Sequence, residues 1–145
     1  MQPHPHLRPT RRLVTGHSPD GKAIFESDDK VIPVNPTPAP ASDTPEDEQT
    51  ALPVGITLIH RTENCPVKIQ GSRNELNVEN LRRGQGEKGV VRQIIDLPPT
   101  SQDKPLYLHR NQSLDYGVVL KGSMNIILDD GEEETLREGD VYVQK

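Results

Sequence analysis

The sequence predicts an all-β protein made of short antiparallel strands. Short apolar or β-branched runs recur along the second half of the 145-residue chain, and glycine, proline or acidic turn residues separate them. No stretch carries a convincing helical periodicity of apolar residues. Strands this short, with turns this frequent, are typical of an antiparallel sandwich or barrel.

The first third of the chain predicts a tail, a pair of strands and a loop. Residues 1–10 are rich in proline and histidine and predict a disordered tail. Strand-like pieces at 11–14 and 23–26 are joined by the turn-rich segment GHSPDG, and we expect residues 11–34 to dock on a later barrel. Residues 35–54 predict a flexible loop, because their proline- and acid-rich sequence cannot bury enough apolar surface to offset the entropy of ordering.

Residues 55–145 predict the barrel itself. In chain order, strand-like runs occur at residues 56–59, 90–97, 114–120, 124–128, 134–136 and 141–144. The Asp-Asp-Gly sequence at 129–131 predicts a hairpin turn, because glycine readily adopts the positive φ that such turns need. Alternation along the last strand places Tyr142 and Gln144 on one face.

Composition gives no support for a nucleic-acid partner, a membrane protein or a secreted protein. The net charge of −5 gives no electrostatic reason to expect a nucleic acid or an anionic membrane as partner. No apolar run reaches the roughly 18 residues of a membrane span, and the N-terminal residues lack the apolar region of a secretory signal. The single cysteine, Cys65, rules out an internal disulfide framework and fits a reducing compartment, so we expect a cytoplasmic protein.

One stretch carries a family resemblance. His109 and Asn111 are followed by Asp115 after three residues, and Gly122 follows after six more. This pattern resembles the first motif of the cupin family, which is His-x-His, three or four residues, Glu, six residues and Gly. The Gly-Asp pair at 139–140 resembles the start of the second cupin motif. The resemblance implies a cupin-type jelly-roll β-barrel.

Two longer segments extend the resemblance. SLDYGVVLKG and RRLVTGHSPDGKAIF are similar to a fungal and bacterial group of cupins, many of whose fungal members belong to secondary-metabolite pathways. The resemblance covers residues 90–145 well and 11–25 weakly. Because the chain stops at Lys145, before the histidine that closes the second motif, we expect a barrel incomplete at its C-terminus. An exposed barrel edge would favour a homodimer.

The candidate catalytic residues are His109, Asn111 and Asp115. The first two are two positions apart, so on a strand both side chains point the same way, and Asp115 can converge on them after a short bend. His109 can be a barrel histidine hydrogen-bonded to Asp115 that serves structure or orients a polar substrate. It can also act as an acid or base, with the aspartate orienting it.

A metal site is the third alternative for these residues. An imidazole and a carboxylate are good ligands for Fe, Mn or Zn, whereas an amide oxygen is a weak one. The resemblance implies a second histidine where this chain has Asn111, and a glutamate where it has Asp115. We therefore expect no bound cofactor; a divalent metal, if one binds, would take His109 and Asp115 as ligands.

Three further residues are candidates for substrate binding. Tyr107 and Tyr116 flank the motif, and core packing is the alternative role for both. His60 ends a short strand, where a surface position is the alternative.

The resemblance implies a tailoring enzyme that acts on an apolar, polyketide- or terpenoid-like small molecule inside the barrel. Its reaction would be an oxidoreduction, or a metal-free isomerisation or cycloaddition. The alternative is a non-catalytic ligand-binding cupin or an inactive fragment, and the sequence selects neither the substrate nor the reaction.

Overall fold

A computed structural model defines the fold. It describes residues 2–4, 6–36, 54–62, 64, 66–67, 89–99, 110 and 112–145. Within these ranges all regular structure is β-strand and every strand pair is antiparallel, which confirms the prediction of an all-β protein. The same ranges contain no helix that is long and apolar enough to cross a membrane. The chain divides into two compact units, Met1–Pro99 and Thr100–Lys145.

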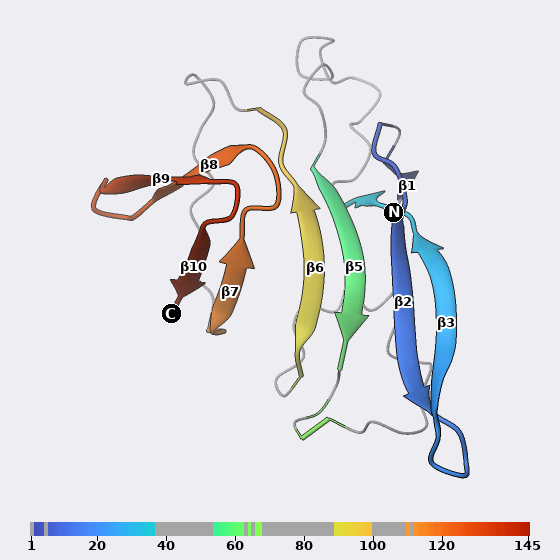
Figure 1. The fold of residues 1–145 in the computed structure, drawn as a ribbon. Helices are drawn as coiled ribbons and strands as arrows, with labels where there is room; N and C mark the ends of the chain where they lie inside the picture. The colour runs from blue at the N-terminus through green and yellow to red at the C-terminus, as the bar shows by residue number, and fades with distance from the viewer. Residues whose placement is uncertain are drawn as a thin grey trace. The chain divides into compact units, whose positions relative to one another are not determined.

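The first unit holds six of the described strands. They are β1 (Gln2–Pro3), β2 (Thr10–His17), β3 (Ala23–Val31), β4 (Val34–Asn35), β5 (Gly55–Arg61) and β6 (Val91–Asp96). Four of them form a sheet in the order β1-β4-β5-β6, and β2 pairs with β3 in a long hairpin (Figure 1). The strands predicted at 11–14, 23–26, 56–59 and 90–97 are confirmed as β2, β3, β5 and β6.

The turn predicted between β2 and β3 is also confirmed. The amide of Ser18 donates to the carbonyl of Lys22 (2.9 Å), and the amide of Gly21 donates to the carbonyl of Ser18 (2.8 Å). Gly21 has a φ of 81°, a conformation that residues with a Cβ rarely adopt. The sequence GHSPDG therefore forms a tight hairpin connection.

Two arginines of β2 cross to aspartates of β3. Arg11 lies beside Asp28 in an exposed pair, with 2.7 Å between Nη2 and Oδ2. Arg12 makes the corresponding pair with Asp29 at 2.6 Å, and its side chain is only 14% exposed. Arg12 also donates from Nη1 to the carbonyl oxygen of Ile59 in β5 (3.2 Å). The hairpin is thus tied to β5 by a hydrogen bond as well as by packing.

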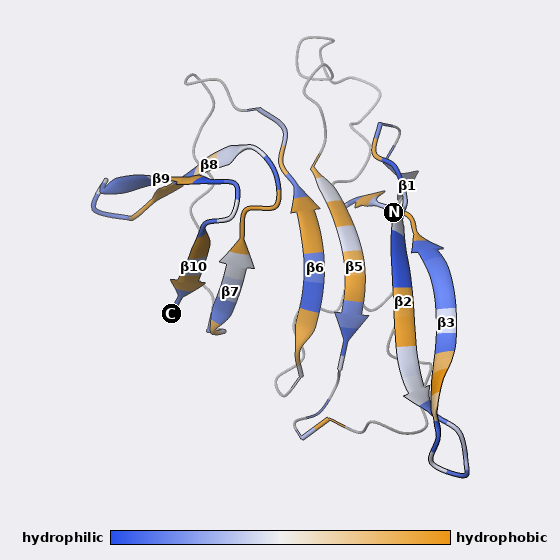
Figure 2. Ribbon diagram, in the orientation of Figure 1, coloured by the Kyte–Doolittle hydropathy of each residue, from blue (hydrophilic) through white to orange (hydrophobic). Residues whose placement is uncertain are grey.

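The most buried strand of the first unit is β5. Thr57 is 1% exposed and Leu58 is 4% exposed, so successive side chains are buried on both faces of the strand. Gly55 leaves room for the side chain of Leu7, whose Cδ1 occupies the space that a Cβ on residue 55 would take. Figure 2 shows hydrophobic bands on β5 and β6, whereas β3 is largely hydrophilic.

The second unit holds four described strands: β7 (Asp115–Val118), β8 (Ser123–Ile127), β9 (Glu133–Arg137) and β10 (Val141–Gln144). β7 pairs with β10, and β8 pairs with β9. The predicted turn at 129–131 joins β8 to β9, with Gly131 at a φ of 91° and the amide of Leu128 donating to the carbonyl of Glu132 (2.8 Å). The strands predicted in this region are confirmed, within a few residues at their ends.

Strand pairing among the described residues does not close a barrel, because it forms four separate sheets. The region predicted as a tail, residues 1–10, contains β1 and the buried His4, whose amide donates to the carbonyl of Pro33 (2.8 Å). Most of the loop predicted at 35–54 lies outside the described residues. The domain boundaries drawn from the sequence stay a prediction.

Candidate functional site

The residues predicted for the site divide into two groups. His109, Asn111 and Tyr107 lie outside the described residues. Asp115 begins β7 and is half-buried, and Tyr116 follows it in the same strand. Whether Asp115 meets the other two candidate catalytic residues therefore stays a prediction.

The β7–β10 sheet has two chemically different faces. Directly opposite residues of an antiparallel pair project to the same face, and successive residues project to opposite faces. The register pairs Asp115 with Gln144 and Gly117 with Tyr142, which defines the Asp115 face. The second face, the Tyr116 face, is formed by the intervening residues Tyr116, Val118, Val141 and Val143.

The Asp115 face is polar, and at Gly117 it has no side chain of its own on β7. Gly117 has no side chain, and the ring of Tyr142 lies across it. The Tyr142 hydroxyl oxygen is 2.6 Å from the position that a Cβ on residue 117 would take. The phenol of β10 therefore reaches across to β7, on the same face as the Asp115 carboxylate.

A turn at the end of the sheet fixes this register. The amide of Gly139 donates to the carbonyl of Val119 (2.9 Å), and the amide of Val119 donates to the carbonyl of Asp140 (3.0 Å). Gly139 has a φ of 92°, which favours glycine. The Asp140 carboxylate accepts a hydrogen bond from the amide of Arg137 (2.8 Å). These contacts place β10 so that Tyr142 faces Gly117.

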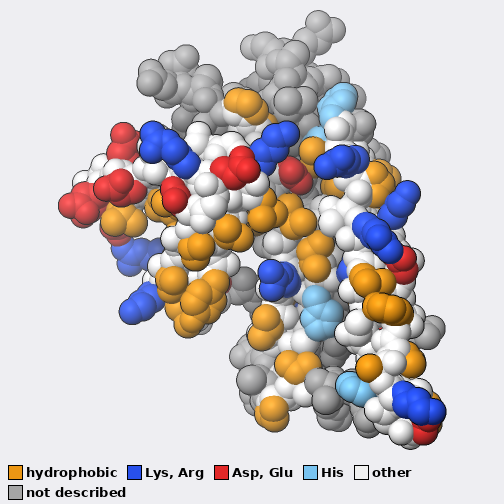
Figure 3. Space-filling view, in the orientation of Figure 1, with side chains coloured by type: hydrophobic (Ala, Val, Ile, Leu, Met, Phe, Trp, Pro, Cys, Tyr) orange, Lys and Arg blue, Asp and Glu red, His pale blue; other side chains and the backbone are white. Residues whose placement is uncertain are grey.

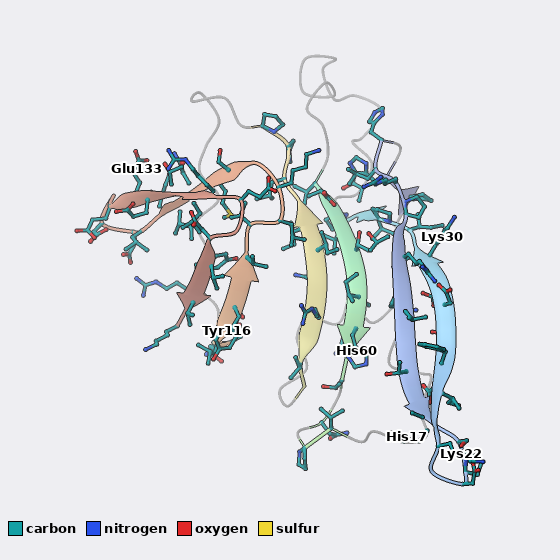
Figure 4. All side chains as sticks on the ribbon, in the orientation of Figure 1. His17, Lys22, Lys30, His60, Tyr116 and Glu133 are labelled. Carbon is teal, nitrogen blue, oxygen red and sulfur yellow. The ribbon has the colours of Figure 1, made fainter. Side chains whose placement is uncertain are left out.

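The Tyr116 face is apolar and exposed. Tyr116 is 74% exposed, Val141 65%, Val143 51% and Val118 49%. Figure 3 shows apolar side chains gathered over β7 and β10, and acidic side chains over the β8–β9 hairpin. Tyr116, predicted as a substrate-binding residue, thus lies on the face opposite Asp115 (Figure 4 labels it near the start of β7).

His60, the other predicted substrate-binding residue, belongs to the first unit. It lies near the end of β5 (Figure 4). The register places it directly opposite Arg92 of β6, so the two side chains share a face. His60 is half-buried and Arg92 is exposed. The role of His60 in substrate binding stays a prediction.

The motif at residues 109–115 supplies one of the two imidazoles of a cupin-type metal centre. A site with two histidines and one carboxylate needs a second imidazole, and the motif of this chain offers His109 with the amide of Asn111 and the carboxylate of Asp115. Only Asp115 lies in the described part of the chain, where no group of three or more His, Cys, Asp or Glu residues could hold a metal ion.

Comparison with known proteins identifies the family. No protein-family model matches the chain. The cupin-domain-containing oxidoreductase virC of Hypocrea virens is 32% identical over 149 residues, which cover 99% of this chain and 66% of the relative. The cupin-domain-containing oxidoreductase fogC of Aspergillus ruber is 33% identical over 135 residues, which cover 92% and 59%. The chain is a cupin-type protein.

A third relative widens the comparison. Phomopsin biosynthesis cluster protein D of Diaporthe leptostromiformis is 29% identical over 152 residues, which cover 97% of this cupin-type chain and 69% of the relative. The chain spans 66% of the length of virC and 59% of the length of fogC. The resemblance predicted from the cupin motif and its flanking segments is confirmed.

Sequence reasoning placed Tyr142 on the face of Gln144 but gave it no role in the site. Alternation shows which residues of one strand share a face, but it does not show which residues of two strands lie opposite each other. The register between the strands supplies the missing information, because it places Tyr142 of β10 directly opposite Gly117 of β7.

Proposed function

We propose that this cupin-type chain is part of a tailoring enzyme that acts on an apolar, polyketide- or terpenoid-like small molecule. The observation that carries the proposal is the likeness to virC over 99% of the chain, since virC is named a cupin-domain-containing oxidoreductase. Other relatives are named as proteins of the phomopsin and oryzines biosynthesis clusters. These names support a role in the modification of a small natural product.

Oxidoreduction is the first candidate reaction, because several relatives carry that name. A metal-free isomerisation or cycloaddition is the second, and the donor set favours it, since Asn111 stands where the cupin pattern has an imidazole. In the metal-free case His109, Asn111 and Asp115 would orient or polarise the substrate by hydrogen bonds. A half-buried carboxylate such as Asp115 can accept a hydrogen bond from a substrate hydroxyl or from an imidazole N–H.

The proposal includes a cellular compartment and a small-molecule partner. The lone Cys65 supports a reducing, cytoplasmic compartment. The net charge of −5 gives no electrostatic reason to expect a nucleic acid or an anionic membrane, so the proposed partner is a small molecule.

The test is a gene deletion in the source organism followed by conversion in vitro. Deletion should cause an apolar compound to accumulate. The purified full chain, assayed with and without an added two-electron oxidant or reductant, should convert that compound to a product seen by mass spectrometry. A change of two hydrogens in the mass indicates oxidoreduction, and an unchanged mass with a new retention time indicates isomerisation or cycloaddition.

Matched variants connect the activity to the site. Asp115→Asn should reduce turnover by about 100-fold or more, as expected for loss of a general base or orienting carboxylate. Glu133→Gln changes an exposed carboxylate of β9 and should leave turnover unchanged. An accumulated compound that binds without conversion would instead support the non-catalytic ligand-binding alternative.

A further inference from the structure

We propose that Tyr142 orients the substrate by donating a hydrogen bond from its phenol to a carbonyl oxygen of the ligand. The inference rests on the proposed function and deepens it, because it names a residue and the group that this residue recognises. The expected ligand is an apolar molecule that carries a ketone or aldehyde.

The position of Tyr142 beside Asp115 is the first reason for this assignment. Tyr142 shares its face of the β7–β10 sheet with Asp115, and its hydroxyl reaches over β7 at Gly117. Gly117 and Asp115 are two positions apart in β7, which is about 7 Å along the strand. A small ligand lying on this face can therefore meet the phenol and the carboxylate together.

The hydrogen bonding of the Tyr142 hydroxyl is the second reason. Tyr142 is half-buried, and its hydroxyl makes no hydrogen bond to a residue in the described ranges. Buried or partly buried phenols usually have a partner, because an unsatisfied hydroxyl costs free energy once water is displaced. An apolar ligand that displaces water from this face would leave the hydroxyl unsatisfied, unless the ligand supplies an acceptor.

Contrast with Tyr116 is the third reason. Both tyrosines lie in the same two-stranded sheet, but Tyr116 projects from the opposite face and is 74% exposed. The glycine opposite Tyr142 gives its ring a flat surface to rest on, which limits the ring's freedom and fixes the direction of the hydroxyl. Tyr142 is thus the better placed of the two to recognise a ligand beside Asp115.

The chemistry of the neighbours defines the ligand group. A phenol is a donor and an acceptor, whereas an ionised carboxylate is an acceptor only. A ligand carbonyl can accept from Tyr142 but would be repelled by Asp115, so the carbonyl is expected beside the Tyr142 hydroxyl and any hydroxyl of the ligand nearer Asp115. This arrangement gives the ligand one orientation on the sheet.

The experiment compares Tyr142→Phe with Tyr116→Phe in the full chain. The probes are three pairs of molecules that differ only in a carbonyl: the phenyl, naphthyl and biphenyl methyl ketones, each against the corresponding ethyl arene. Binding is measured by ligand-observed NMR titration. The midpoint of thermal unfolding is recorded for each variant, as the readout that a structural role would move.

The wild-type chain should bind at least one ketone about three- to tenfold more tightly than its ethyl arene, the range expected for a neutral hydrogen bond. Tyr142→Phe should abolish this preference without weakening the ethyl arene or lowering the unfolding midpoint. Tyr116→Phe should keep the preference.

Four results would overturn the inference. A preference that survives Tyr142→Phe, or that is lost in Tyr116→Phe, assigns the role elsewhere. Equal binding of ketones and ethyl arenes by the wild type contradicts the role of Tyr142 and leaves the proposed apolar site intact. Binding of none of the six probes contradicts both proposals.

Discussion

Tyr142 lies directly opposite Gly117 in the β7–β10 pair, and its ring fills the space that a side chain on residue 117 would need. The two residues depend on each other: the glycine allows the ring to cross the strand, and the ring covers the backbone that the glycine leaves bare. This relationship links the sequence of β7 to the shape of the candidate site.

Replacement of Gly117 by alanine should therefore move the Tyr142 ring. We expect Gly117→Ala to destabilise the fold by about 1–3 kcal/mol, the usual cost of forcing extra volume into a packed site. Gly16→Ala is the matched control, because its Cβ would meet the exposed, flexible side chain of Glu26, which can move aside. Thermal unfolding followed by circular dichroism measures both. Equal losses for the two variants would contradict the account.

Gly55 and Leu7 should show energetic coupling. A Cβ on residue 55 would collide with Leu7, so Gly55→Ala alone should cost about 1–3 kcal/mol. In a Leu7→Ala background the same change should cost markedly less, because the colliding side chain is gone. A double-mutant cycle with urea unfolding measures the coupling. Strictly additive effects would show that Leu7 does not lie over residue 55 in solution.

The two arginine–aspartate pairs of the β2–β3 hairpin should differ in their effect on stability. Arg12→Met removes a half-buried pair and the hydrogen bond to the Ile59 carbonyl, and should cost about 1–2 kcal/mol. Arg11→Met removes a pair whose two side chains are 69% and 50% exposed, and should change the unfolding midpoint very little. The reverse order of effects would mean that Arg12 does not tie the hairpin to β5.

The Arg11–Asp28 pair predicts a small dependence of stability on pH. The hydrogen bond from Arg11 lowers the pKa of Asp28 below its usual value of 3.8. A carboxyl whose pKa is lowered on folding stabilises the fold above the unfolded pKa, and this stabilisation is lost as pH falls through the folded pKa. The midpoint difference between wild type and Asp28→Asn should be constant at neutral pH and shrink below pH 3.8.

High salt gives the control for that prediction. Both side chains of the pair are exposed, so salt at about 1 M should screen their attraction and reduce the difference at neutral pH. A midpoint difference that grows on acidification would contradict the assigned cause of the lowered pKa.

The unpaired edge of β10 predicts that two copies of the chain associate. β10 pairs only with β7 among the described strands, and an unpaired edge favours addition of another strand. We expect the chain to form a concentration-dependent homodimer in sedimentation-velocity runs. Val143→Lys, which places a charge on the edge strand, should shift the equilibrium toward the monomer. A wild-type chain that stays monomeric at every concentration would contradict this expectation.

Much of the fold could be predicted because local signals are strong where turns are tight. The glycines of GHSPDG and of the Asp-Asp-Gly turn take the positive φ that their positions predict, and the strands on either side follow from alternation and β-branched runs. β1 and β4 could not be predicted in this way. Each has only two residues, and their pairing joins segments about 30 positions apart by backbone hydrogen bonds that leave no pattern in the side chains.

The site was only partly predictable for a different reason. The motif gives the identity of Asp115, and alternation gives the face that Tyr142 shares with Gln144. Register between β7 and β10 depends on the turn at Gly139 and on pairing across more than 20 residues, which no local pattern encodes. No pattern in the sequence therefore showed that Tyr116 and Tyr142 lie on opposite faces of one sheet.

The measurement that tests the central claim most directly is NMR of the full chain with ¹³C-labelled tyrosine. The chain has three tyrosines, so Tyr→Phe variants at 107, 116 and 142 assign every signal. On addition of the best-binding methyl ketone, the account predicts that the Tyr142 signal shifts and the Tyr116 signal does not. A shift of Tyr116 with Tyr142 unchanged would place the ligand on the opposite face and contradict the account.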